Sequence, residues 1–272
     1  MDKEKFRTVM TYGLGNNPRQ KYNAFTGISI ACPFFTTRLY DEEYYKRRLN
    51  SRDLTAVCRW VLDRFDKYLL LVGDSLLQFN FMAFCSMSEK EAIERSLAIG
   101  NIWYEFCAGI SKKFQPRVEV WRWSELAADN EFSRFINAGR NFAMANPAYR
   151  SALRALAITS IPIEFEEASK RHNKQELENI LDIATNYSID EIAGLLYIYE
   201  LTNYKISVSK YEPLPPVKAI YGGHYPELSD GLGLKNFGHI QISKNGKKIH
   251  CDDEFLEVYH AIKILGSLEV LI

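Results

Sequence analysis

The chain has 272 residues, of which 47% are hydrophobic and 25% charged, so it can bury a large core and is not a disordered polypeptide. Its 34 Lys and Arg residues equal its 34 Asp and Glu residues, which excludes RNA binding through an overall basic charge. The five cysteines are odd in number and lack metal-pair spacing, which favours a reduced, cytoplasmic setting. No apolar segment has the length of a secretory signal or a membrane span.

Strand, helix and strand signals follow one another in the first 75 residues. An apolar run leads into Gly27 and Ser29, and Ser51 then precedes apolar side chains at helical spacing. A second apolar run ends at Gly73. A strand–helix–strand crossover of this kind requires a parallel sheet with helices on its faces. The expected elements are a strand at 24–30, a helix that follows Ser51 and a strand at 68–72.

Helices dominate the middle of the chain. Ser88 and Glu91 form a capping box that predicts a long helix to about Lys112. Pro147 divides the helical segment 124–156 into at least two pieces. A second box, Ser188-x-x-Glu191, predicts a helix boundary near residue 188. The remaining expected elements are a strand at 118–122, helices at 174–184 and 188–202, and strands at 204–209 and 217–221.

The two ends of the chain do not continue this alternation of strand and helix signals. Residues 1–20 are expected to be a flexible leader. Ile240 and Ile242 alternate with polar residues, and Asn245-Gly246 predicts a hairpin turn. A short helix is expected at 254–265. The prediction is a single α/β domain over 1–272 with a hairpin–helix extension at 232–272, built on a parallel sheet with helices on both faces.

Candidate site residues follow three of the expected strands. Ligands of open α/β sheets bind at the carboxyl ends of the strands. Those ends carry Gly27-Ile28-Ser29, Val72-Gly73-Asp74 and Ala219–Gly223. In the helix that precedes the last of them, Tyr197 and Glu200 share a face, where a carboxylate needs a cationic or hydrogen-bonding partner. The histidines form neither a Ser/His/Asp set nor a metal spacing, so no metal is expected.

The order and intervals of several short motifs resemble those of the cyclodipeptide synthases, over about residues 22 to 225. The family carries a Gly-x-Ser motif at the end of its first strand, a Ser-Glu-Leu…Glu-Tyr segment, and a helix with Tyr-x-x-x-Glu. The corresponding segments here are Gly27-Ile28-Ser29, Pro33-Phe34-Phe35-Thr36, Ser124-Glu125-Leu126 with Glu131-Phe132, Gly194-Leu195-Leu196-Tyr197, and Pro215 to Tyr221.

The resemblance implies a Rossmann-like fold similar to the class Ic aminoacyl-tRNA synthetase catalytic domains, and an aminoacyltransferase that makes a diketopiperazine from two aminoacyl-tRNAs. It makes Ser29 the nucleophile of a ping-pong reaction and Glu200 the partner of the substrate's α-ammonium group, with Tyr197 and Tyr221 beside that amine. No cofactor is expected, because the aminoacyl ester is already activated. Family members are typically monomers, and no membrane contact is implied.

Further residues are expected to contact the substrates. The proposed amino-acid pocket consists of Gly27, Phe25, Cys32, Leu69, Leu71, Asp74 and Trp123, with Leu156 as a further lining residue. Asp74 would suit a cationic side chain. The residues proposed to contact tRNA are Lys46, Arg47, Arg48, Arg52, Arg95, Lys112 and Lys113.

Three departures from the family pattern leave two alternatives open. Glu200 comes one residue early, with Leu201 in the expected place. Cys32 and Gly222 match neither known subgroup, and Tyr225-Pro226 competes with Tyr221 as the last site motif. The helix that often binds tRNA in the family has one base here, Arg95. The alternatives are a tRNA-binding homologue with altered chemistry and a Rossmann-like transferase or hydrolase that acts on small molecules.

Overall fold

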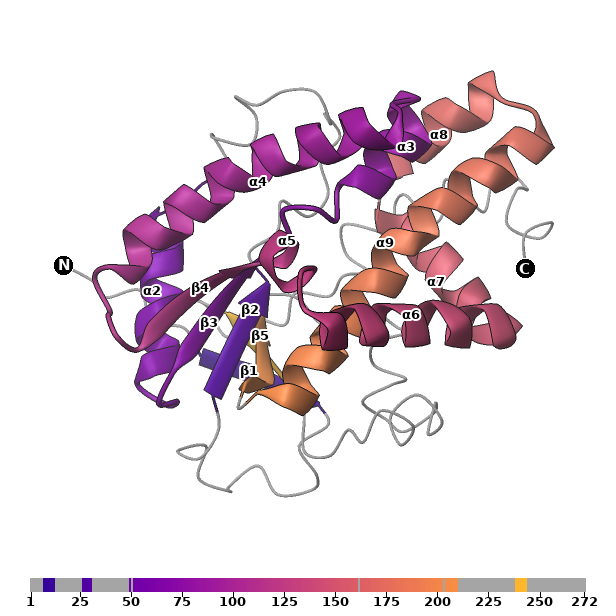
Figure 1. Ribbon diagram of the computed structural model, residues 1–272. Coiled ribbons are helices and arrows are strands. Elements are labelled where there is room, and N and C mark those ends of the chain that lie inside the picture. The colour runs from indigo at the N-terminus through magenta and orange to yellow at the C-terminus, as the bar shows by residue number, and fades with distance from the viewer. Residues whose placement is uncertain are drawn as a thin grey trace.

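The computed structural model describes residues 7–12, 26–30, 49, 51–160, 162–202, 204–209 and 238–243 (Figure 1). Its strands are β1 (Arg7–Tyr12), β2 (Thr26–Ile30), β3 (Tyr68–Val72), β4 (Val118–Arg122), β5 (Tyr204–Ser209) and β6 (Gly238–Ser243). The expected strand at 217–221, the hairpin turn at Asn245-Gly246 and the helix at 254–265 lie outside the described residues.

The strands form one sheet in the order β1-β6-β5-β2-β3-β4. Each neighbouring pair from β6 across to β4 is parallel, and β1 is antiparallel to β6. The chain therefore builds the sheet outward from β2, first through β3 to β4 and then on the other side through β5 to β6. The strand order reverses between β2 and β5, and such a reversal is where open α/β sheets bind ligands, beyond the carboxyl ends of the strands.

The helices are α2 (Ser51–Leu62), α3 (Gln78–Cys85), α4 (Glu89–Ser111), α5 (Trp123–Leu126), α6 (Asn130–Ala145), α7 (Pro147–Ser160), α8 (Pro162–Arg171) and α9 (Lys174–Leu201). The Ser88 capping box that starts α4 is confirmed, because its hydroxyl accepts from the Glu91 amide and the Glu91 carboxylate accepts from the Ser88 amide. Pro147 begins α7, as expected of a residue without an amide hydrogen. Helices α3 and α8 were not predicted.

Helices cover both faces of the sheet, as the alternation of β3 shows. Leu69 and Leu71 belong to a core cluster with residues of α5, α6 and α9, whereas Leu70 and Val72 pack with residues of α2 and the C-terminal half of α4. All four side chains are fully buried, and each contributes roughly 1.5–3 kcal/mol by leaving water. Figure 1 shows α4 and α9 as the long helices that flank the strands.

Helix α9 corrects the prediction of two helices at 174–184 and 188–202. It runs without a break from Lys174 to Leu201, and its capping box is Asn173 with Glu176. Ser188, predicted to be a cap, lies in the helix interior and is buried. The local pattern Ser-x-x-Glu was misleading because packing against α3, α6 and α7 holds the whole segment helical.

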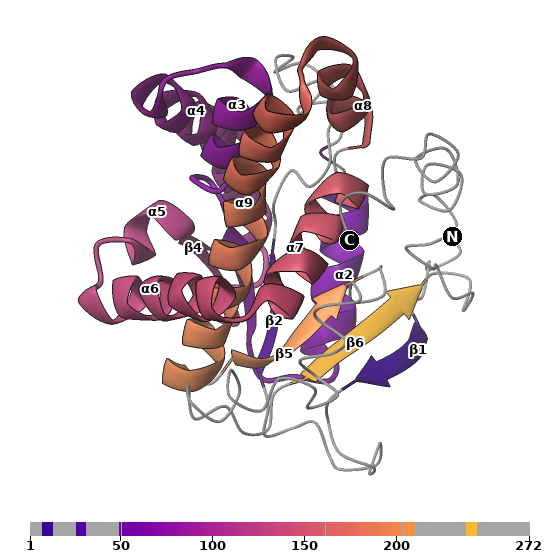
Figure 2. The same cartoon turned by 90° about the vertical axis from the view of Figure 1, so that its right-hand side faces the viewer.

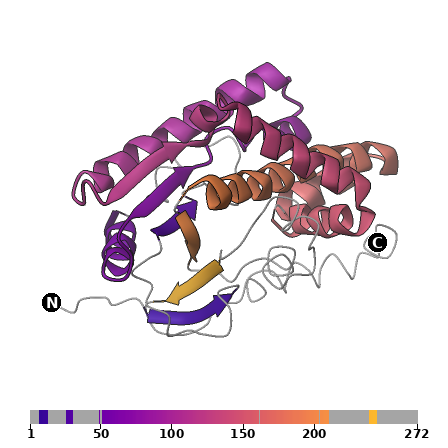
Figure 3. The same ribbon diagram turned by 60° about the horizontal axis from the view of Figure 1, so that its bottom comes forward.

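Strand β1 corrects the prediction of a flexible leader at residues 1–20 for its part 7–12, and the other residues of that range lie outside the described part of the chain. Residues Arg7–Tyr12 form β1, which pairs with β6 from the far end of the sequence. Figures 2 and 3 show these two strands side by side at one edge of the sheet. A pairing between segments so distant in sequence leaves no local signal, and here it joins the expected leader to the expected C-terminal extension.

Candidate active site

Ser29 lies at the next-to-last position of β2, near the point where the strand order reverses. In the register of the sheet, Ser29 pairs with Leu70 of β3, and Gly27 pairs with Tyr68 on one side and Ile206 of β5 on the other. Since β2 has parallel neighbours on both sides and the strand order reverses beside it, its carboxyl end is the position at which such folds bind ligands. The backbone position of Ser29 therefore fits the predicted nucleophile.

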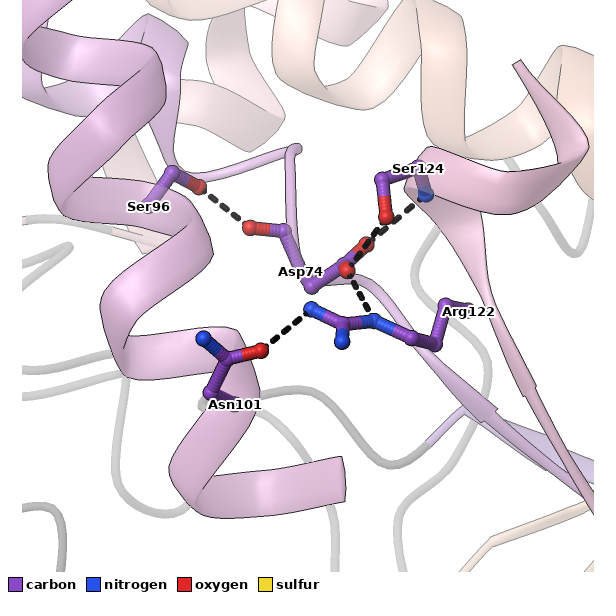
Figure 4. A network of polar contacts seen from close by, with 5 residues as sticks. All are labelled: Asp74, Ser96, Asn101, Arg122 and Ser124. Atoms are coloured by element: carbon purple, nitrogen blue, oxygen red, sulfur yellow. Dashed lines mark hydrogen bonds and ion pairs between the residues drawn. The ribbon is translucent and has the colours of Figure 1, made fainter. Parts of the chain in front are cut away.

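Asp74, just beyond β3, is the centre of a polar network (Figure 4). Its Oδ2 accepts hydrogen bonds from Arg122 Nε at 2.7 Å and Ser124 Oγ at 2.6 Å, and its Oδ1 accepts one from the Ser124 amide at 2.8 Å. Arg122 also donates to Asn101 Oδ1 at 2.6 Å, and Ser96 Oγ donates to the Asp74 carbonyl at 2.7 Å. The network thereby ties the ends of β3 and β4 to α4 and α5.

Asp74 was predicted to bind a cationic substrate side chain, but in the structure its carboxylate already binds Arg122 and Ser124. Its carboxylate is fully buried and its charge is balanced by Arg122. Helix α4 packs closely against Asp74, since even a Cβ at Gly100 would lie 2.1 Å from Asp74 Cβ. The substrate-binding role of Asp74 stays a prediction. Its contacts make it a structural residue that holds the ends of β3 and β4 against α4 and α5, and we call this role a brace.

A row of aromatic side chains joins α5, α6 and α9 beside this brace. Trp123 meets Phe132 edge to face at a centroid distance of 5.3 Å, and Tyr197 meets Phe132 at 5.1 Å and Phe135 at 5.7 Å. Gly194 allows α9 to approach, because a Cβ there would lie 2.3 Å from the Trp123 ring. Trp123 and Tyr197, both predicted site residues, are thus brought into one cluster with Leu69 and Leu71.

The Tyr197 hydroxyl donates a hydrogen bond to Asp129 Oδ2 at 2.6 Å. Burial and this bond to a carboxylate raise the pKa of Tyr197 to about 12. The same bond lowers the pKa of Asp129, which also accepts from the Glu131 amide. Tyr197 is therefore a neutral phenol, and its proton is directed at Asp129.

Of the other predicted site residues, the structure describes some and not others. Glu200 lies in the last turn of α9 and Gly27 in β2. Leu156 lies in α7. Phe25, Cys32, Tyr221 and Tyr225 lie outside the described residues, as do Lys46, Arg47 and Arg48.

The remaining predicted tRNA contacts are scattered. Arg52 is exposed at the start of α2, Arg95 is half-buried in α4, and Lys112 and Lys113 are exposed just after α4. The exposed side chains along α4 also include acidic ones, at Glu89, Glu91, Glu94 and Glu105. Together with the exposed Lys90, these side chains give α4 mixed charges rather than a basic face for phosphate groups. The described part of the chain therefore offers no continuous basic surface along α4.

Glu191 is a candidate that sequence reasoning assigned to a helix cap. It lies in the interior of α9, two turns after Ala184, and therefore on the side of α9 that packs against Ala83 of α3. No hydrogen-bond or ion-pair partner of Glu191 occurs in the described part of the chain. Burial raises the pKa of Glu191 to about 8.

Replacing Glu191 by glutamine is expected to stabilise the protein at pH 8. Between pH 4.5 and about 8 the folded state retains a proton that the unfolded state has released, so the free energy of unfolding of the original chain falls as pH rises. Glutamine removes that loss, which for a shift of this size is on the order of 4 kcal/mol at pH 8 and close to zero at pH 4. Urea denaturation at both pH values measures it. The exposed Glu94→Gln serves as control, and equal stability of Glu191→Gln and the original chain at pH 8 would refute the raised pKa.

Two searches of the described residues concern other site types. No group of three or more His, Cys, Asp and Glu side chains there is arranged to hold a metal ion. None of the helices in those ranges has the length and apolar character needed to cross a membrane.

The parallel sheet with helices on both faces defines the chain as a Rossmann-like α/β protein. Comparison with known proteins narrows the class of fold further. No family model and no curated protein matches the sequence. Solved structures do match: a cyclodipeptide synthase from Bacillus thermoamylovorans has a TM-score of 0.63 at 14% identity, over 91% of this chain and 98% of that one. The chain therefore has the fold of the cyclodipeptide synthases, with a divergent sequence.

Two further structures extend the comparison. A CDPS from Fluoribacter dumoffii has a TM-score of 0.61 at 14% identity, over 88% of this chain and 98% of that one. The cyclodipeptide synthase from Candidatus Glomeribacter gigasporarum, solved bound to Phe-tRNAPhe, has a TM-score of 0.55 at 16% identity, over 86% and 93% of the two chains. This chain spans nearly the whole length of each.

Proposed function

We propose that this chain is a tRNA-dependent cyclodipeptide synthase, which joins two amino acids from aminoacyl-tRNAs into a diketopiperazine. The observation that carries the proposal is the match in fold over nearly the whole length of cyclodipeptide synthases, with Ser29 near the carboxyl end of β2 where the strand order reverses. One of the matching enzymes is bound to Phe-tRNAPhe, which supports aminoacyl-tRNA as the substrate class.

In the proposed reaction the Ser29 hydroxyl attacks the ester carbonyl of the first aminoacyl-tRNA. The terminal ribose hydroxyl of the tRNA leaves with the proton, and the amino acid stays on Ser29 as an ester. The amine of this ester then attacks the ester of the second aminoacyl-tRNA and releases the second tRNA. The free amine of the resulting dipeptidyl ester attacks the Ser29 carbonyl, which closes the ring and restores the hydroxyl. Because the last step is intramolecular, correct orientation lowers its barrier by several kcal/mol.

The other proposed residues act on the substrate amine. Glu200 would balance the α-ammonium charge before the amine loses its proton, and Tyr221 would contact the same group. Tyr197 would contribute the oxygen of a neutral phenol, since its proton is donated to Asp129. Leu69, Leu71 and Trp123 would supply apolar surface for the side chain of the amino acid.

A tRNA-binding homologue with altered chemistry is the second candidate. It is favoured by one observation: the predicted catalytic Tyr197 already donates its hydroxyl proton to Asp129. That candidate predicts tRNA binding without product. A small-molecule transferase is the third, and the acidic side chains along α4 favour it because it needs no contact with phosphates.

The test is mass spectrometry of culture medium from a bacterial host that expresses the chain, beside the same host with the Ser29→Ala variant. We expect a diketopiperazine only with the unaltered chain, and its fragment ions, compared with synthetic standards, identify both amino acids. A folded, well-expressed chain that gives no such product, and that forms none from purified aminoacyl-tRNAs of all twenty amino acids, would refute the synthase. Binding of tRNA by that inactive chain would then support the second candidate.

A further inference from the structure

Asp129 connects two tasks at the start of α6. Its Oδ1 accepts from the Glu131 amide at 2.8 Å and so caps the helix, whereas its Oδ2 accepts from the Tyr197 hydroxyl at 2.6 Å. Helix capping needs only a short polar side chain, which serine, asparagine and aspartate all supply. The contact with Tyr197 needs a longer side chain, and it links α9 to α6 across 68 residues of sequence.

The ring of Tyr197 is held as firmly as its hydroxyl. Phe132 and Phe135 meet it edge to face, and both belong to α6, the helix that Asp129 caps. Only 7% of Tyr197 is exposed. Phe132 and Phe135 thus fix the ring of Tyr197, and Asp129 at the start of α6 fixes its hydroxyl oxygen.

The charges near this hydroxyl keep it protonated. Burial opposes a phenolate most strongly, and Asp129 and, more weakly, Glu131 act in the same direction. Arg134 of α6 lies nearby and is paired with Glu131. On α9 the acidic residues nearest to Tyr197 in sequence are Glu200 and Glu191, and Asp190, one residue before Glu191, is paired with Arg140 of α6. The balance favours the neutral phenol, whose remaining capacity is to accept a hydrogen bond through its oxygen.

We propose that Asp129 is a positioning residue of the synthase site: it binds the Tyr197 proton, so that Tyr197 acts in the reaction as a fixed hydrogen-bond acceptor for the substrate amine and not as a proton donor or general base. The proposal rests on the proposed function. It assigns to Asp129 a role beyond the helix cap, and it explains how a tyrosine engaged by a carboxylate can still contribute to catalysis.

Two variants separate the cap from the contact with Tyr197. Asp129→Ser keeps a cap for α6 but is too short to reach Tyr197. Asp129→Asn keeps the cap through its single amide oxygen but turns its NH2 group, a donor, toward the Tyr197 hydroxyl, so it cannot accept the Tyr197 proton. We expect kcat for diketopiperazine formation to fall about tenfold or more in both variants, with KM little changed, because neither accepts the Tyr197 proton while capping α6. Asp63→Asn, at an exposed aspartate after α2, is the matched control. Circular dichroism checks that all variants fold.

A second measurement does not depend on catalysis. With 13C-labelled tyrosine, the NMR signal of Tyr197 is assigned from its absence in Tyr197→Phe, and its titration is followed with pH. We expect Tyr197 to ionise at lower pH in Asp129→Ser than in the original chain. Unchanged titration, or a folded Asp129→Ser with the original kcat, overturns the proposal. If the original chain forms no product while the titration shifts as expected, the proposed function fails and the contact between Asp129 and Tyr197 stands.

Discussion

Replacing Ser29 by alanine is expected to abolish covalent labelling of the chain by aminoacyl-tRNA and to reduce diketopiperazine formation below detection. Alanine has no hydroxyl to form the ester, and neither Cys58 nor Cys107 can substitute readily. Cys58 and Cys107 are buried on the α2 and α4 side of the sheet, and burial raises the pKa of each thiol to about 12, so neither is a thiolate at neutral pH. The expected loss exceeds that for any other single side chain.

The measurement is intact-protein mass spectrometry after acid quench of the chain with aminoacyl-tRNA. The original chain should gain the mass of one aminoacyl group, and Ser29→Ala should gain none. Ser133→Ala, on α6, is the matched control and should be labelled like the original chain. Labelling of Ser29→Ala to the original extent would show that another residue is the nucleophile. No labelling of either chain would contradict the ester intermediate itself.

The elements with strong local signals were predicted from the sequence. The apolar run Tyr68–Val72 is β3, the alternating segment Val118–Arg122 is β4, and the Ser88 box starts α4. The parallel sheet with helices on both faces is confirmed as well. Each of these features depends on residues close in sequence, where side-chain periodicity and capping chemistry can be read directly.

The contacts that shape the site could not be predicted in this way. Asp74 and Arg122 are 48 residues apart, and Asp129 and Tyr197 are 68 apart. Such pairs arise from the packing of separate elements and have no periodicity. The roles of Gly100 and Gly194 were equally hidden in the sequence. A glycine inside a helix is normally expected to destabilise that helix, whereas Gly100 lets α4 approach Asp74 and Gly194 lets α9 approach Trp123. The sequence could identify Tyr197 but not its partner.

Replacing Asp74 by alanine is expected to destabilise the protein by about 3–5 kcal/mol, because it leaves the Arg122 guanidinium without the carboxylate that balances its charge. The Ser124 amide and hydroxyl lose their acceptor at the same time. Asp74→Asn retains the size and one acceptor oxygen, so its loss should be smaller, about 1–3 kcal/mol. Urea denaturation at pH 7 measures both, with Asp63→Ala as a control at an exposed aspartate.

The order of these losses tests what the network does. Ser124 follows Trp123, whose ring contacts Phe132 and so leads to Tyr197. If Asp74 braces this path, a folded Asp74→Asn should lose turnover while its affinity for aminoacyl-tRNA is retained. If Asp74 instead contacts the substrate, Asp74→Asn should raise KM for a cationic amino acid and leave stability nearly intact. A loss of less than 1 kcal/mol in Asp74→Ala would contradict the brace, since a buried, paired carboxylate cannot be removed from its arginine at so small a cost.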